Sequence, residues 1–147
     1  MKVAIYSRGV DIDQQQSLNA LLTELYRYDI DIFVFEDLIQ KFDLKAIAGK
    51  PALIPFKDSH DLHNAIDCLI SVGGDGTVLD AITLVGDTNI PILGVNYGRL
   101  GFLASISKDE LSLMVDALVN RSYVIDKRTL IHLDADFPVF GGTPFAL

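Results

Sequence analysis

Short apolar runs alternate along the chain with stretches in which apolar residues recur at helical spacing. The runs are predicted to be strands, and they comprise residues 3–6, 31–35, 52–56, 68–72 and 90–95. The helical stretches comprise residues 13–28, a helix from about Leu38 that ends near Gly49, residues 59–66, residues 78–85 and a helix that begins after residue 107. This alternation predicts an α/β fold, in which a parallel sheet is flanked by helices in a Rossmann-like arrangement.

Two local signals mark where elements lie or begin. The run at residues 52–56 follows Pro51 and contains Pro55, and prolines cannot donate to a central ladder, so we expect the run at an edge of the sheet. Ser107 and Glu110 have the spacing of a capping box, in which each side chain satisfies a backbone N–H group near the other residue. The capping box predicts a helix start at this point.

The pattern changes after Ser122. Residues 123–125 and 130–136 read as strands, residues 141–144 read as a turn, and no helical period follows. We therefore predict an N-terminal α/β domain over residues 1–122 and the beginning of a β-rich second domain over residues 123–147. The apolar end of the chain, without a terminal turn, indicates a piece of a longer protein.

Charge and composition exclude several classes of partner. The 147 residues include 12 basic and 20 acidic side chains, for a formal net charge of −8. Nucleic-acid backbones and anionic membranes are bound by basic faces, so neither is an expected partner. No stretch approaches the roughly 20 apolar residues that span a bilayer. The single cysteine, Cys68, offers no disulfide framework, which points to the reducing cytoplasm.

A glycine-rich segment follows directly after the predicted strand at residues 68–72. It consists of Gly73, Gly74, Asp75, Gly76 and Thr77. In a parallel sheet it would lie at the ligand-binding edge, where glycines allow close backbone approach and the free N–H groups of a helix start attract anions. Those properties suit a phosphate group. The segment is neither a Walker A loop nor a Gly-x-Gly-x-x-Gly fingerprint.

Asp75 needs a different role, because a carboxylate repels phosphate unless a cation intervenes. It could accept a hydrogen bond from a ribose hydroxyl, take the proton of that hydroxyl, or hold a phosphate-bound Mg²⁺ ion. All three roles belong to phosphoryl transfer onto an alcohol. The alternative is a tight turn in which Asp75 only caps the helix that follows.

Two arginines are candidate phosphate contacts. Arg8 follows the first predicted strand, and Arg99 follows the strand at residues 90–95. Both would lie at the ligand-binding edge of a parallel sheet. For each of them a solvated surface arginine is the alternative.

A second motif narrows the set of families that the glycine-rich segment can indicate. The first motif runs from Gly73 to Leu79, and the second runs Pro91-Ile92-Leu93-Gly94-Val95-Asn96-Tyr97-Gly98-Arg99-Leu100-Gly101-Phe102-Leu103. Together they resemble the NAD kinases. Lipid kinases share the first motif but usually continue it with Asn-Glu, where Leu79-Asp80 stands in this chain.

The resemblance implies transfer of the ATP γ-phosphate, or of phosphate from polyphosphate, to the 2′-hydroxyl of the adenosine ribose of NAD, giving NADP. It implies that Asp75 is the general base, that the backbone of residues 73–77 holds phosphates and the dinucleotide, and that Mg²⁺ accompanies ATP. It also implies a dimer or tetramer. The nucleotide-binding candidates are Gly73, Gly74, Gly76, Thr77, Leu79, Asn96, Arg99 and Phe102.

The resemblance also marks what the chain lacks. In the family, the β-rich second domain carries an Asn-Glu or Asn-Asp pair and most of the residues that contact NAD. Neither pair is present in the 147 residues, so we expect the isolated piece to be inactive. The alternatives for the whole protein are a lipid kinase with the same glycine loop and a nucleotide-binding module without catalysis.

Overall fold

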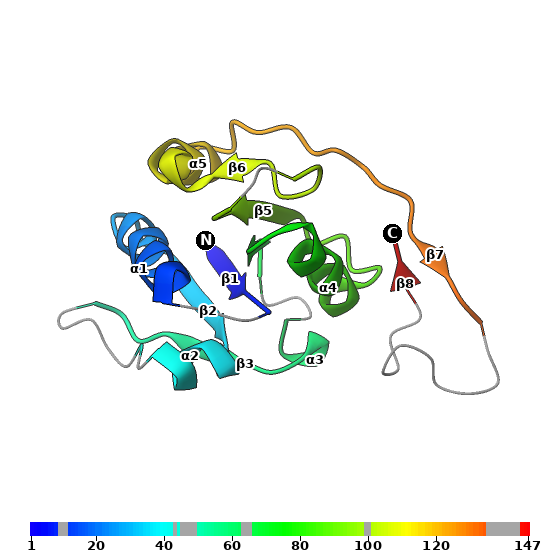
Figure 1. Cartoon of the computed structure of the whole chain (residues 1–147), viewed down its shortest axis with the longest axis horizontal. Coiled ribbons are helices and arrows are strands. Elements are labelled where there is room, and N and C mark those ends of the chain that lie inside the picture. Colours follow the sequence, from blue (N-terminus) through cyan, green and yellow to red (C-terminus); the bar gives the residue numbers. More distant parts are fainter. Residues whose placement is uncertain (9–11, 43, 45–49, 63–65, 99–100, 135–144) are drawn as a thin grey trace.

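A parallel sheet with helices on both faces forms the body of the molecule (Figure 1). A computed structural model describes residues 1–8, 12–42, 44, 50–62, 66–98, 101–134 and 145–147. Within them the strands of the sheet are β1 (Lys2–Tyr6), β2 (Asp31–Phe35), β3 (Ile54–Phe56), β4 (Cys68–Val72), β5 (Ile92–Asn96) and β6 (Ile106–Ser107). Their spatial order is β3-β2-β1-β4-β5-β6, and every neighbouring pair is parallel. The predicted fold class is confirmed.

The helices divide between the two faces of the sheet. They are α1 (Ile12–Leu25), α2 (Glu36–Phe42), α3 (Ser59–Leu62), α4 (Asp75–Val85) and α5 (Leu111–Val119), with a 3₁₀ turn η1 (Lys108–Glu110) before α5. Helices α1 and α5 pack together on one face, and Leu38 of α2 joins their core. Helices α3 and α4 cover the other face through Leu62, Ala81 and Val85.

Strand β4 shows why this sheet is stable. It lies between β1 and β5, and all five of its residues are buried. A parallel strand covered by helices on both faces buries successive side chains on alternate faces, so it reads as a continuous apolar run. Ile70 accordingly packs in the core beneath α1 and α5, while Leu69 packs in the core beneath α3 and α4.

Several predicted elements are confirmed, some with shifted ends. Strand β3 is an edge strand, as its prolines require. The capping box at Ser107 and Glu110 is present, but it begins η1 rather than the α-helix itself. Helix α4 starts at Asp75, three positions before the predicted start at residue 78, so the glycine-rich segment supplies its first turn. The two-residue strand β6 was not predicted, because it is too short to show a periodic pattern.

The C-terminal part is extended rather than packed. Residues 122–130 form no helix or strand, so the strand predicted at 123–125 is wrong. Of the strand predicted at 130–136, the described residues form only β7 (Ile131–His132), which pairs antiparallel with β8 (Phe145–Ala146). The turn predicted at 141–144 lies outside the described residues. Figure 1 shows this segment leaving α5, with β8 beside α4. Among the described helices, none is both long and apolar enough to cross a membrane.

Candidate active site

The carboxyl ends of the central strands bring together segments that are far apart in the sequence. Strand β1 leads to Arg8, β4 leads to the glycine-rich segment and α4, and β5 leads to the second motif. Because all of these strands are parallel, their following loops meet at one edge of the sheet. The backbone N–H of Gly73 donates to the carbonyl of Val95 at 2.9 Å, so the start of the first motif lies beside the middle of the second.

Asp75 joins the two motifs through its carboxylate. The oxygen Oδ1 accepts hydrogen bonds from the backbone N–H groups of Leu103 and Ala104, at 2.9 and 3.0 Å. The oxygen Oδ2 accepts from the N–H of Phe102 at 2.9 Å. The N–H groups of Ala104, Phe102 and Leu103 lower the pKa of Asp75, because they stabilise its charged form. The carboxylate is therefore ionised at neutral pH.

This arrangement rules out the simple capping interpretation of Asp75. Gly74 is the N-cap residue of α4, and no side chain makes a hydrogen bond at that cap. Asp75 occupies the first helical position instead, where negative charge is favourable, and directs its carboxylate at a loop 27 to 29 positions later. The end of the second motif and the residue after it thus supply the hydrogen-bond donors to Asp75.

Two glycines make this closure sterically feasible. A Cβ on Gly101 would lie 2.1 Å from Oδ1 of Asp75, so any side chain there would push the loop off the carboxylate. Gly73 has a φ of +150° and a Cβ there would lie 2.3 Å from Oγ1 of Thr77. Both positions therefore require glycine in this conformation.

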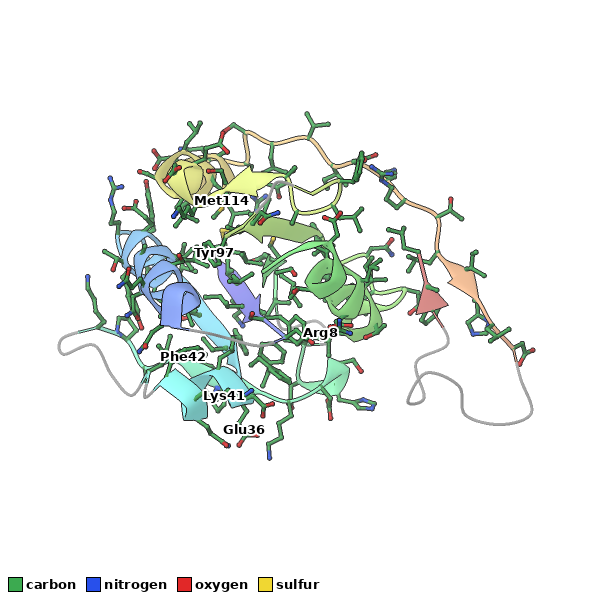
Figure 2. All side chains as sticks on the ribbon, in the orientation of Figure 1. Arg8, Glu36, Lys41, Phe42, Tyr97 and Met114 are labelled. Atoms are coloured by element: carbon green, nitrogen blue, oxygen red, sulfur yellow. The ribbon has the colours of Figure 1, made fainter. Side chains whose placement is uncertain are left out.

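Arg8 and Asp80 form an ion pair beside the glycine-rich segment. Nε of Arg8 lies 2.6 Å from Oδ2 of Asp80, and Nη2 of Arg8 donates to Oδ1 at 2.9 Å. The side chain of Arg8 comes from the end of β1, and Figure 2 shows it beside α4, which carries Asp80. Burial of the ring, together with the charge of Asp80, raises the pKa of the neighbouring Tyr6. The ion pair therefore fixes the orientation of Arg8, although its side chain remains on the surface.

Sequence reasoning did not select Asp80 as a site residue. The available signal was the acidic side chain at Leu79-Asp80, where lipid kinases usually carry Asn-Glu. Its partner Arg8 lies 72 positions earlier in the chain. Only the pairing of β1 with β4 brings the two side chains together.

The other predicted nucleotide-binding residues have different environments. The side chains of Leu79 and Phe102 are exposed, Phe102 almost completely at 97%. Thr77 and Asn96 are buried. The Oδ1 atom of Asn96 accepts a hydrogen bond from the N–H of Gly98 at 2.7 Å, so Asn96 shapes the turn that follows β5. Gly74 and Gly76 lie at the start of α4, and Arg99 lies outside the described residues.

The described residues contain no ready-made metal site and no reactive thiol. Among them, no three His, Cys, Asp or Glu side chains are grouped so that they could hold an ion. Cys68 is buried, and burial raises the pKa of its thiol to about 12. Cys68 is therefore a core residue.

A parallel sheet that carries a glycine loop and an ionised carboxylate at its carboxyl edge is typical of α/β domains that bind ligands at that edge. The comparisons with known proteins narrow this class. Residues 53–123, which include both motifs, match the family model of the ATP-NAD kinase N-terminal domain. This match confirms the resemblance to the NAD kinases that the two motifs predicted, and it places the chain alongside the N-terminal part of its relatives.

Two relatives show how far the similarity extends. The NAD kinase of Cytophaga hutchinsonii is 36% identical over 147 residues, which are 100% of this chain and 50% of the relative. The NAD kinase of Bacteroides fragilis is 33% identical, again over 100% of this chain and 50% of the relative. The chain thus spans about half the length of the curated relatives it matches.

A solved structure has the same fold. The crystal structure of yeast NADH kinase, complexed with NADH, matches with a TM-score of 0.70 and 23% sequence identity. The match covers 81% of this chain and 36% of the yeast chain. It supports the α/β arrangement described above.

Proposed function

We propose that the protein to which this chain belongs is an NAD kinase, which transfers the γ-phosphate of ATP to the 2′-hydroxyl of the adenosine ribose of NAD and forms NADP. The observation that carries the proposal is the Asp75 carboxylate, held between the two motifs at the ligand-binding edge of the sheet. The relatives named NAD kinase and the yeast enzyme complexed with NADH support the choice of substrate.

Asp75 is the proposed general base for the ribose hydroxyl. A carboxylate offers about four lone-pair sites, and three backbone N–H groups occupy two sites on Oδ1 and one on Oδ2. The remaining site on Oδ2 can accept the hydroxyl. The lowered pKa keeps Asp75 ionised but also makes it a weak base, so proton transfer has to be concerted with attack of the hydroxyl oxygen on phosphorus.

The remaining candidates divide by the part of the substrates that each suits. Gly73, Gly74, Gly76 and Thr77 are proposed to form the phosphate site, because residues 75–77 are the first turn of α4 and the free N–H groups of a helix start favour anions. The exposed Leu79 and Phe102 are proposed to contact the adenosine of NAD, since apolar side chains suit a base. Arg99, together with the turn shaped by Asn96, is proposed to complete the site.

The site suits a divalent metal ion only if the ion is bound to the phosphates of the donor. Asp75 is engaged by backbone N–H groups and Asp80 by Arg8, so neither offers a dedicated metal cage. Mg²⁺ typically binds through substrate phosphates with one or two carboxylates, and it would neutralise charge on the transferred phosphoryl group. We therefore propose Mg²⁺ as the companion of ATP; polyphosphate remains an alternative donor.

The wider setting of the enzyme is also part of the proposal. We propose an α/β domain over residues 1–122 and a β-rich domain that begins at residue 123. The change from buried helices and strands to an exposed extended segment near that position supports this division. A dimer or tetramer is proposed from the family resemblance, and the cytoplasm from the single buried cysteine.

The test measures NADP formation by the full-length protein incubated with NAD, ATP and Mg²⁺. Asp75→Asn should lower the rate by about 10²–10⁴-fold, because it removes the general base. Asp109→Asn, which alters an exposed carboxylate of η1, is the matched control and should retain the wild-type rate. Thermal unfolding of each variant separates a catalytic loss from a folding defect.

Each other outcome has a defined meaning. NADP formation that survives in Asp75→Asn would preserve the enzyme but contradict the general-base assignment. A well-folded wild-type protein that makes no NADP would contradict the NAD kinase proposal. Phosphorylation of diacylglycerol or sphingosine would then identify a lipid kinase, and ATP binding without any transfer would identify a binding module.

A further inference from the structure

The guanidinium group of Arg8 is oriented so that one of its edges is turned toward the glycine-rich segment. Asp80 engages the edge formed by Nε and Nη2. The third nitrogen, Nη1, lies 3.6 Å from the place where a Cβ on Gly76 would be. Because Gly76 has no side chain, the residue does not block a ligand that lies between Nη1 and the Gly76 backbone.

Stabilisation of the fold does not explain the ion pair between Arg8 and Asp80. The Arg8 side chain is 66% exposed, and exposed ion pairs contribute little to the free energy of unfolding. What the pair does supply is orientation. A bidentate carboxylate fixes the plane of a guanidinium and leaves the remaining N–H groups directed elsewhere.

We propose that Arg8 contacts the phosphates of the ATP donor through Nη1, and that Asp80 is a positioning residue that holds the guanidinium in place. This inference rests on the proposed function. Gly76 directly follows Asp75, so Nη1 lies beside the backbone next to the proposed acceptor of the ribose hydroxyl. The phosphate that passes to the hydroxyl has to lie near the same point, and an arginine there stabilises its charge.

The charges at this edge support the assignment to ATP. Asp75 in the glycine-rich segment and Asp80 further along α4 both carry negative charge, and the donor phosphates add more. A chain with a formal net charge of −8 has no general attraction for such a ligand. A cation fixed at the site therefore offsets local repulsion, and Arg8 is placed to do so.

The experiment compares four variants of the full-length protein. They are Arg8→Gln, Arg8→Lys, Asp80→Asn and the control Arg27→Gln, which removes a similarly exposed arginine paired with Glu24 on α1. The KM for ATP, the KM for NAD and kcat are measured for each. Arg8→Gln should raise the KM for ATP about 10- to 100-fold and leave the KM for NAD within about twofold.

The remaining variants separate charge from orientation. Arg8→Lys keeps the charge but loses the planar fork, so its KM for ATP should fall between those of wild type and Arg8→Gln. Asp80→Asn should raise the KM for ATP by about 3- to 10-fold without changing the KM for NAD. Arg27→Gln should match wild type in all three quantities.

Several results would overturn the inference. A wild-type KM for ATP in Arg8→Gln would remove Arg8 from the phosphate site, and a raised KM for NAD alone would assign it to the other substrate. Tighter ATP binding in Asp80→Asn would show that Asp80 withholds the guanidinium rather than positioning it.

A direct measurement of ATP binding tests the role of Arg8 independently of whether the protein is an NAD kinase. Calorimetry with ATP and with adenosine measures how much the phosphates contribute to affinity, whether or not NADP is formed. Arg8→Gln should lose most of the preference for ATP over adenosine. An unchanged preference would overturn the inference even in a protein that makes NADP.

Discussion

Strand β4 and the segment at residues 123–133 are both rich in apolar residues, but they have opposite environments. All five residues of β4 are buried between β1 and β5 and beneath helices on both faces. In the later segment Tyr123, Val124 and Ile125 are exposed, and so are Ile131 and Leu133. Apolar composition gives a segment a tendency to form a strand, but a ladder also needs a neighbouring strand, and only β4 has neighbours along its whole length.

The loops at the carboxyl edge of the sheet have an environment between these two extremes. These loops are partly exposed, yet hydrogen bonds to Asp75 and the ion pair at Arg8 hold them in place. A few polar contacts therefore hold the loops of the edge in place, and apolar packing stabilises the sheet. Within the described residues, few contacts hold the extended segment. Four measurements test this ranking.

The largest effect is expected in the centre of the sheet. Ile70→Ala removes a completely buried side chain between Ile5 and Leu93, so it leaves a cavity beneath α1 and α5. The free energy of unfolding should fall by about 2–5 kcal/mol. Urea denaturation measures it, and a loss below about 1 kcal/mol would contradict the close packing of β4.

The next effect is expected where the two motifs meet. Gly101→Ala places a methyl group on the Asp75 carboxylate, and the loop has to move away and lose its hydrogen bonds. We expect a loss of about 1–3 kcal/mol of stability, together with loss of NADP formation. Gly98→Ala is the matched control, because its nearest atom outside the chain neighbours is 3.7 Å away. Gly98→Ala is a control for stability only, and equal losses of stability in the two variants would contradict the closure on Asp75.

A pH series tests the same contact through its charge. The backbone N–H groups lower the pKa of Asp75 from 3.8, so the ionised carboxylate stabilises the folded state. This stabilisation is complete above the unfolded value and is lost as the pH falls through the folded one. The difference in unfolding free energy between wild type and Asp75→Asn should be constant above about pH 5 and narrow below it. A difference that stays constant down to pH 2 would contradict the assignment.

The smallest effect is expected in the extended segment. Val124 is 96% exposed, so Val124→Ala should change the free energy of unfolding by less than about 0.5 kcal/mol. Val34→Ala, the same substitution at a fully buried position of β2, should cost about 2 kcal/mol. Parallel denaturation curves compare the two. A large loss at Val124 would show that the segment is packed in solution.

Local patterns in the sequence were enough to predict much of the fold. The strand at 68–72, the edge position of the proline-containing strand and the capping box at Ser107 are all present in the structure. Each of these features can be recognised from residues close together in the sequence. A strand buried on both faces is a continuous apolar run, a proline lacks an N–H group, and a capping box joins residues three positions apart. The strand predicted at 123–125 failed for the complementary reason, since its apolar residues meet no partner strand.

The candidate site was predicted only in part. The glycine-rich segment and Asp75 were selected as candidates because their residue types are unusual after a buried strand, and the second motif carried the resemblance to the NAD kinases. The partners of Asp75 could not be predicted, since they are backbone N–H groups and carry no signature in the sequence. Asp80 was missed because an acidic residue on a helix surface is ordinary until its partner is known.

The sequence by itself determined the class of fold, the resemblance to the NAD kinases and the residue types at the carboxyl edge of the sheet. Only the tertiary structure decided which side chains act together: Asp75 with residues 102–104, and Arg8 with Asp80 across 72 positions. The physical reason lies in the parallel sheet, whose crossover connections place the ends of distant strands at one edge. The hydrophobic pattern of a helix or strand predicts which of its side chains are buried. Contacts between loops at the sheet edge depend instead on the register between strands.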